Sequence, residues 1–275
     1  MNIQNNKTYQ SLQYEEKQLI NKLLTATDLI CMYEYGSTVY KSNTPESDVD
    51  LILVIHTSSL FSSIEYPNEV FGILRKFNAE FINTDNYEIY DGQMQFKYHN
   101  LSLNIYTDDE WQNKSNSLSI DTLECHFNKD GIFKQDKEYI TNIDKIQLRK
   151  SISATVSNSW VKGKKKILQG DDRIGYKSIF HAIRILKFGI QIYQYNCIKY
   201  FDEPTIEYYN LIVGRYNRYK NEGLSGIDLY NAIIYDPKFP GTFNLKKEMN
   251  NLKSFFKLFT DDEWKKLKQM NNDKQ

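Results

Sequence analysis

The chain has 275 residues, enough for one large domain or two of ordinary size. Its 35 Lys and Arg residues balance 35 Asp and Glu residues, which argues against a protein that coats nucleic acid through bulk charge but leaves room for a local basic groove. No apolar run approaches the roughly 18 residues of a membrane span, and the polar first residues do not resemble a signal peptide. The three cysteines are scattered, so they indicate neither a disulfide framework nor a zinc site. We expect a soluble cytoplasmic protein without a membrane partner.

The first half of the chain predicts a mixture of helices and strands. Apolar residues from Gln10 to Leu24 recur at helical spacing. The apolar runs at 29–36 and 49–55 predict buried strands, the first of them ended by Gly36, and a helix is expected within 65–77. Short strand-like runs separated by Asn and Gly then follow at 79–83, 87–91, 93–98 and 101–106. In the last run Leu101, Leu103 and Ile105 share one face, and Ser102 and Asn104 share the other.

The pattern changes after about Thr141 to long helical periods. Apolar residues at helical steps predict one helix with Ile143, Ile146, Val156, Trp160 and Ile167, and a second with Ile179, Ile183, Leu186, Ile190 and Tyr193. A loop is expected between them at 169–175, and the tail is helical again over 245–259 and 260–270. The sequence therefore predicts an α+β fold, with a mixed α/β part over 1–140 followed by an α-helical part over 141–275.

The most informative segment is YGSTVYKSNTPESDVDLILV at 35–54. Asp48 and Asp50 are two residues apart in a predicted strand, so both side chains project from one face. Neighbouring carboxylates raise each other's pKa unless a cation lies between them, and a hard divalent ion such as Mg²⁺ satisfies both. The small Gly36–Ser37 pair lets a phosphate approach the backbone, where amides and the Ser37 hydroxyl can donate to it. The segment thus predicts a site for a nucleoside triphosphate with a metal ion; a chance pairing of a strand end and a common turn is the alternative.

The same segment resembles the signature of the polymerase-β-like nucleotidyltransferase superfamily: a hydrophobic residue, Gly-Ser, a spacer, then Asp-hydrophobic-Asp-hydrophobic. SNTPESDVDL is especially similar to a bacterial and phage branch of predicted nucleotidyltransferases associated with RNA ligases, and KSIFHAIRILKFGIQIY at 177–193 looks like that branch's Lys-x-x-x-His-Ala-x-Arg helix. The resemblance implies a small mixed β-sheet nucleotidyltransferase domain flanked by helices, with a helical domain that closes the nucleotide cleft. It also implies that Asp48 and Asp50 are the catalytic ligands of Mg²⁺ or Mn²⁺, and that Gly36 and Ser37 hold the triphosphate.

Basic residues gather on one face of the second predicted helix. Lys177, His181 and Arg184 are spaced by four and three, and the rest of this helix is largely apolar, which indicates a buried helix whose basic face borders a cleft. Lys177 and Arg184 would then bind phosphate oxygens and His181 would donate to them. A solvated face, or pairing with acids elsewhere, is the alternative. The lysines at 162 and 164–166 are typical of a solvated helix end, or of a strip that follows an RNA or DNA backbone.

One expected feature is missing from the sequence. Active members of the superfamily usually carry a third carboxylate on a neighbouring strand, yet the matching positions here are Ser102 and Asn104. The acids that follow belong to TDDE at 107–110, which predicts a helix start capped by Thr107 with Glu110 in the capping box.

Two functions therefore compete. The first is a nucleotidyltransferase that moves NMP from an NTP to a hydroxyl acceptor, an RNA end or a protein side chain, with release of pyrophosphate. The second is a catalytically impaired nucleotide- or RNA-binding module that keeps the fold. A purely structural role for Asp48 and Asp50 is a third possibility, and it predicts no metal-dependent NTP binding. The sequence does not indicate which NTP or which acceptor is used, or what the oligomeric state is.

Overall fold

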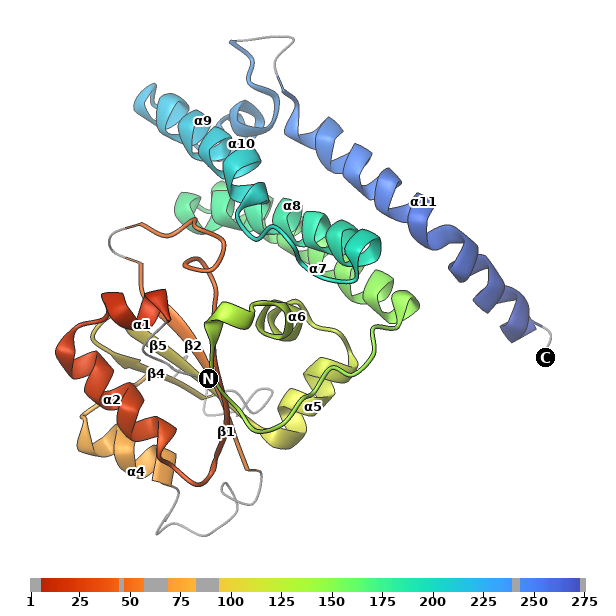
Figure 1. The fold of residues 1–275 in the computed structure, drawn as a ribbon. Coiled ribbons are helices and arrows are strands. Elements are labelled where there is room, and N and C mark those ends of the chain that lie inside the picture. The colour runs from red at the N-terminus through yellow and green to blue at the C-terminus, as the bar shows by residue number, and fades with distance from the viewer. Residues whose placement is uncertain (1–5, 45–46, 57–68, 83–93, 239–242, 273–275) are drawn as a thin grey trace. The chain divides into compact units, whose positions relative to one another are not determined.

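The protein is described by a computed structural model that covers residues 6–44, 47–56, 69–82, 94–238 and 243–272, with side chains after Leu258 placed only at Asp261. The chain divides into two compact units, Met1–Asn142 and Ile143–Gln275, which are described separately (Figure 1). Unit 1 is a mixed sheet flanked by helices and unit 2 is helical, so the predicted α+β class is confirmed. The roles predicted for residues 1–140 and 141–275, a nucleotidyltransferase domain and a domain that closes its cleft, stay predictions.

Unit 1 is built around a six-stranded sheet in the order β3-β4-β5-β2-β1-β6. Its strands are β1 (Leu29–Tyr35), β2 (Val49–Ile55), β3 (Glu80–Phe81), β4 (Met94–Tyr98), β5 (Leu101–Thr107) and β6 (Ile132–Gln135). The central pair, β2 and β5, is parallel, and the other four pairings are antiparallel. Strand β2 is almost continuously apolar because it lies at the middle of the sheet, where both faces are covered.

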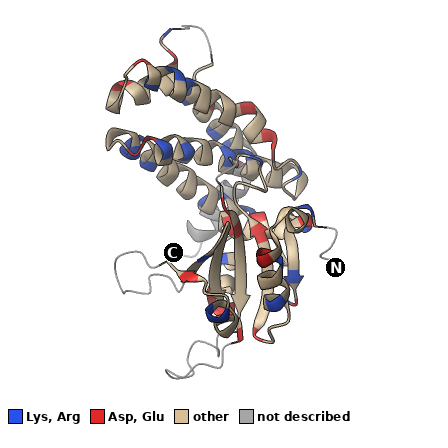
Figure 2. Cartoon of the chain, turned by 90° about the vertical axis from the view of Figure 1, so that its left-hand side faces the viewer, with Lys and Arg blue, Asp and Glu red and all other residues tan. Residues whose placement is uncertain are grey.

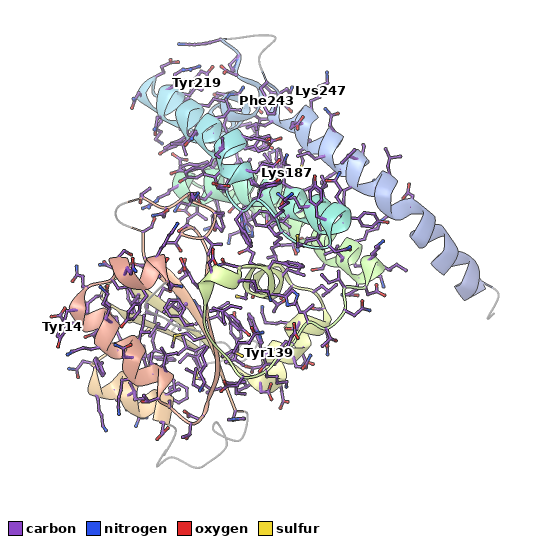
Figure 3. All side chains as sticks on the ribbon, viewed as in Figure 1. Tyr14, Tyr139, Lys187, Tyr219, Phe243 and Lys247 are labelled. Atoms are coloured by element: carbon purple, nitrogen blue, oxygen red, sulfur yellow. The ribbon has the colours of Figure 1, made fainter. Side chains whose placement is uncertain are left out.

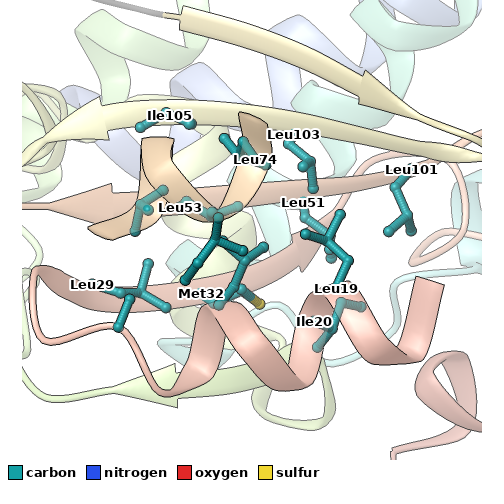
Figure 4. Close-up of a cluster of buried hydrophobic side chains, with 14 of the residues drawn as sticks. Leu19, Ile20, Leu29, Met32, Leu51, Leu53, Leu74, Leu101, Leu103 and Ile105 are labelled. Carbon is teal, nitrogen blue, oxygen red and sulfur yellow. The ribbon is translucent and has the colours of Figure 1, made fainter. Parts of the chain in front are cut away.

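Helices cover both faces of this sheet (Figure 1). On one face, α1 (Lys7–Ser11), α2 (Tyr14–Leu24) and α4 (Glu69–Lys76) pack over a large apolar cluster. Figure 4 shows Leu19 and Ile20 of α2 meeting Met32 of β1 in this cluster. On the other face, α5 (Asp108–Asn116) and α6 (Ile120–Phe127) contribute Trp111 and Cys125 to a smaller cluster. Each central strand therefore buries alternate residues in two different cores.

Unit 2 is organised around two long antiparallel helices, α7 (Lys145–Leu168) and α8 (Asp172–Tyr195). They approach closely at two glycines: a Cβ on Gly163 would lie 2.7 Å from Cγ1 of Ile179 and 2.9 Å from the carbonyl oxygen of Gly175. The described residues of this unit also form a short π-helix (Thr205–Tyr209) and the helices α9 (Asn210–Asn221), α10 (Gly226–Tyr235) and α11 (Leu245–Asn272).

Most predicted elements occur close to their predicted places, but three expectations need correction. The helix expected over 10–24 is two helices, because Gln13 acts as the N-cap of α2 in a capping box with Glu16. The loop expected at 169–175 is shorter, since α8 already begins at Asp172. Ile143, which was expected within the first long helix, lies before the start of α7 at Lys145. The strand-like run at 87–91 lies outside the described residues. Within the described part of the chain, no helix is both long enough and apolar enough to cross a membrane.

Candidate functional site

The two aspartates lie at the start of β2, at the middle of the sheet. Asp50 is opposite Tyr35 of β1 and beside Ser102 of β5, and Ser102 is opposite Lys97 of β4. The ammonium of Lys97 lies 3.2 Å from Oδ2 of Asp48. Because residues paired across neighbouring strands share a face, this ion pair brings Asp48 to the face that carries Asp50. The two predicted carboxylates therefore lie on the same face of the sheet.

Gly36 lies directly against the carboxylate of Asp50. Its φ is +82°, a conformation that favours glycine, and a Cβ at this position would be only 2.5 Å from Oδ2 of Asp50. The chain then turns through Ser37, with hydrogen bonds from the Val39 amide to the Gly36 carbonyl (3.1 Å) and from the Ser42 amide to the Ser37 carbonyl (3.0 Å). Glycine is therefore needed here for both backbone conformation and space.

The start of this turn offers backbone donors. Within the described ranges, neither the amide of Ser37 nor that of Thr38 donates a hydrogen bond to another residue. Ser37 itself is only half-buried. The Ser37 and Thr38 amides and the Ser37 hydroxyl can therefore bind an anion such as a phosphate group, close to the Asp50 carboxylate that Gly36 contacts.

The positions expected to hold a third acid carry neutral side chains. Ser102 and Asn104 lie on the predicted face but are buried, with 5% and 3% exposed. The Ser102 hydroxyl accepts a hydrogen bond from Nε2 of Gln95 (3.1 Å), and Nδ2 of Asn104 donates to the hydroxyl of Tyr35 (2.8 Å). Among the described side chains, no group of three His, Cys, Asp or Glu residues is arranged to hold a metal ion.

The electrostatics of this face involve a residue that the sequence did not single out. Burial and the charge of Asp50 raise the pKa of Tyr35 far above its usual value, so its hydroxyl keeps its proton. Tyr35 therefore accepts from Asn104 while it retains a proton to donate. No sequence pattern indicated this pair, because 69 residues separate its members and only the strand order brings them together.

Neighbouring acids have structural roles. Glu34 is next to this face in sequence, but it is opposite Leu51, in the large apolar cluster, and accepts a hydrogen bond from the Thr8 hydroxyl (2.9 Å). Burial raises the pKa of Glu34, which disfavours the ionised form that a metal ligand needs.

The predicted capping box at the start of α5 is confirmed, since the Thr107 hydroxyl accepts from the Glu110 amide and Glu110 accepts from the Thr107 amide.

The donor set fits a divalent ion only if the substrate completes it. Two carboxylates on one face are the ligands that Mg²⁺ takes together with phosphate oxygens and water. The Lys97 ammonium beside Asp48 also indicates that this position attracts a cation. A site built from protein ligands alone is not supported, because the neutral Ser102 and Asn104 stand where a third carboxylate is expected.

The predicted basic residues lie together on α8 in unit 2. Lys177 and His181 are half-buried, whereas Arg184 is only 2% exposed, so a simple solvated face is excluded for Arg184. Nη2 of Arg184 lies 2.7 Å from Nδ1 of His181. Burial and the charges of Arg184 and Lys162 lower the pKa of His181 to about 3, so the ring is neutral and accepts from Arg184 through Nδ1. Their role toward a nucleotide stays a prediction.

Comparisons with known proteins add little to this description. No family model and no curated protein matches the sequence. Among solved structures, the chain is similar to the spectinomycin adenyltransferase AAD(9) from Enterococcus faecialis, crystallised with ATP and spectinomycin, with 14% identity over 88% of this chain and 97% of that chain and a TM-score of 0.38. It is also similar to a nucleotidyltransferase-like protein from Exiguobacterium sibiricum 255-15, with 10% identity over 91% of this chain and 75% of that chain and a TM-score of 0.28. Similarity this low does not establish a shared fold, so the function proposed below rests on the residues of this chain.

Proposed function

We propose that unit 1 is a metal-dependent nucleotidyltransferase domain, which moves NMP from an NTP to a hydroxyl acceptor and releases pyrophosphate. The observation that carries the proposal is the contact of Gly36 with the carboxylate of Asp50, since it joins the predicted phosphate-binding turn to the predicted metal ligands. Figure 2 marks the acidic residues on the strands of this unit. The resemblance of segment 35–54 to the polymerase-β-like signature supports the same reaction.

The residues of the chain would act by binding and orientation. The Ser37 hydroxyl and the amides of Ser37 and Thr38 donate to oxygens of the triphosphate, which fixes the α-phosphorus in front of Asp48 and Asp50. The acceptor hydroxyl attacks that phosphorus in line, and the pyrophosphate leaves on the opposite side. Lys97, whose ammonium pairs with Asp48, would supply a positive charge for phosphate oxygens beside the two carboxylates.

Asp48 and Asp50 would hold the divalent ion, Mg²⁺ or Mn²⁺. When bound, the ion neutralises charge on the phosphates and lowers the pKa of the attacking hydroxyl. Lys177, His181 and Arg184 of unit 2 are likewise proposed to be nucleotide-binding residues, with Nε2–H of the neutral His181 as a donor. The acceptor is proposed to be an RNA end or a protein side chain.

A second function is favoured by one specific observation, the neutral Ser102 and Asn104. Without a third carboxylate the acceptor hydroxyl lacks one means of activation, which fits a catalytically impaired nucleotide- or RNA-binding module. Such a module would bind an NTP with a metal ion but release no pyrophosphate.

One experiment separates these functions. The protein is incubated with each α-labelled NTP, with Mg²⁺ or Mn²⁺, and with RNA and protein acceptors. The enzyme transfers label to one acceptor class and releases pyrophosphate, and both are lost in Asp50→Asn. Metal-dependent binding without transfer supports the binding module. Absence of metal-dependent binding refutes both.

A further inference from the structure

The two units carry opposite charge, although the whole chain is neutral. Unit 2 has 24 Lys and Arg residues against 14 Asp and Glu residues, whereas unit 1 has 11 against 21. Figure 2 shows the Lys and Arg residues distributed along the helices of unit 2. An excess of positive charge in one half of a chain favours binding of a polyanion by that half.

Helices α7 and α11 contact each other and run antiparallel within unit 2. The ammonium of Lys246, near the start of α11, lies 5.1 Å from the ring centre of Trp160, in the second half of α7. Further along α11, Oδ1 of Asp261 lies 2.9 Å from Nη1 of Arg149, near the start of α7. These two contacts fix the line along which the helices meet, which we call the α7–α11 seam.

Lysine side chains gather along this seam. Lys246, Lys253 and Lys257 follow one another at steps of seven and four, so they share one face of α11. Lys164 follows Trp160 by one turn and therefore lies on the face of α7 that Lys246 contacts. Lys246 and Lys253 are roughly 10 Å apart along the helix axis, so they can contact separate charges of an extended anion.

Three lysines of the seam are not offset by acids. Lys164, Lys246 and Lys253 form no ion pair with any carboxylate that the structure describes. Burial and the charges of Lys246 and Lys257 lower the pKa of Lys253, so the charges that act on it most are positive. Repulsion among these ammonium groups is relieved when an anion binds between them. The seam is therefore suited to a ligand with several negative charges.

Uncharged polar residues lie on the same helix faces as these lysines. Ser157 is three residues before Trp160 and Asn250 is four residues after Lys246, and both are exposed. Hydroxyl and amide groups of this kind bind phosphate oxygens together with lysines. The ring of Trp160 is only 7% exposed, so it can neither enter a lipid layer nor stack on a base. The seam therefore fits the phosphate backbone of a nucleic acid better than a membrane surface.

We propose that the α7–α11 seam binds a nucleic-acid strand through its phosphate backbone, whatever its base sequence. Lys164, Lys246 and Lys253 each pair with a phosphate, and the release of counterions from the strand supplies most of the affinity. The proposal goes beyond the reaction proposed for unit 1, because this binding needs neither an NTP nor a metal ion.

The test uses the full chain in EDTA and without NTP. Its probe is a short fluorescein-labelled single-stranded RNA of mixed sequence, compared with an uncharged peptide nucleic acid of the same sequence. Affinity is measured by fluorescence anisotropy at several KCl concentrations. We expect the logarithm of the RNA association constant to fall linearly with the logarithm of the KCl concentration, with a slope of about −2 for three bound phosphates. The peptide nucleic acid should not bind.

Three outcomes would overturn the proposal. They are absence of RNA binding, equal affinity for the peptide nucleic acid, and binding to phosphatidylserine vesicles without binding to RNA. The last outcome would assign the seam to a lipid surface. Because these measurements include neither an NTP nor a metal ion, their result does not depend on any transfer by unit 1.

Variants locate the binding. Lys164→Gln, Lys246→Gln and Lys253→Gln should each weaken RNA binding about threefold at about 0.2 M KCl and make the salt slope about 0.7 less steep. Lys253→Gln should not lower the melting temperature, because it removes repulsion between like charges. The matched control is Lys247→Gln, since Lys247 is exposed on α11 (Figure 3) but lies about 100° around the helix from Lys246.

The control variant should keep the RNA affinity and the salt slope of the parent protein. Circular dichroism confirms that each variant is folded. An equal loss of affinity in Lys247→Gln and Lys246→Gln would assign the binding to the general charge of unit 2 and refute the seam. Unchanged affinity in both Lys246→Gln and Lys253→Gln would refute it as well.

Discussion

Gly36→Ala tests the contact that joins the turn to the carboxylates. An alanine at φ +82° costs roughly 1–2 kcal/mol in backbone conformation. Its Cβ would also lie 2.5 Å from Oδ2 and 3.2 Å from Cβ of Asp50, so the aspartate must move, which costs about 1–2 kcal/mol more. We expect the free energy of unfolding to fall by about 2–4 kcal/mol in total, since overpacking adds to the backbone term.

The control is a glycine with the same backbone conformation but no neighbour. Gly170 has φ +85° and open space where a Cβ would lie. Gly170→Ala should therefore cost only the backbone term, about 1–2 kcal/mol. In addition, Gly36→Ala should lower the free energy of unfolding by less in an Asp50→Ala background. In that background the carboxylate is absent, and only the contact between the new Cβ and the Cβ of residue 50 remains.

The assay is urea unfolding followed by circular dichroism, with NTP binding in Mg²⁺ measured on the folded proteins. Gly36→Ala should lose metal-dependent NTP binding, whereas Gly170→Ala should keep it. The close contact and its role in the site would be refuted if both glycine variants lost the same free energy of unfolding and if the loss in Gly36→Ala were the same with and without Asp50→Ala.

Three further predictions follow from the positions of single side chains. The pKa of His181 is lowered to about 3 in the folded protein, so the unfolded chain binds the proton first as the pH falls. The free energy of unfolding should therefore decrease as the pH drops from about 6.5 toward 3, by at most about 1.4 kcal/mol per pH unit. In urea unfolding experiments, His181→Gln should lack this pH-dependent decrease. Arg184→Ala should weaken triphosphate binding more than nucleoside binding, measured per folded molecule by calorimetry; an equal loss for both would make Arg184 structural. Ser102→Asp places a carboxylate beside Asp50 and should raise pyrophosphate release. Asn104→Asp replaces the amide that donates to Tyr35 by a buried carboxylate and should only destabilise the sheet. Any transfer by the parent protein should be slow in Mg²⁺ and faster in Mn²⁺. Turnover of Ser102→Asp no higher than that of the parent would contradict the assignment of this position.

The elements that the sequence predicted well have strong local signals. Strand β2 is apolar at every position except Asp50, because the sheet covers both of its faces. Helix α8 repeats apolar residues at helical spacing along its length. The alternation in β5 is likewise confirmed, since Leu101, Leu103 and Ile105 enter the large cluster. Such patterns follow from burial of one or both faces of a single element, so they can be recognised without the rest of the fold.

The features that the sequence did not predict depend on weak local signals or on partners distant in the chain. Gln13 is an uncommon N-cap, so the break between α1 and α2 was hidden within a continuous helical pattern. Strand β6 has only four residues and is defined by its pairing with β1. In the site, the Asp48–Lys97 pair and the bond between Asn104 and Tyr35 depend on the strand order, which no local pattern determines.

The central claim is that Asp48 and Asp50 hold a divalent ion for a nucleotide. It is tested most directly by calorimetric titration of NTP, in Mg²⁺ and in EDTA, into the parent protein, Asp48→Asn, Asp50→Asn and the control Asp130→Asn, whose side chain is exposed in the same unit. We expect Mg²⁺-dependent binding by the parent and the control, and a loss of at least about tenfold in both site variants, with their folding intact. Unchanged NTP affinity in Asp48→Asn and Asp50→Asn would contradict the metal site.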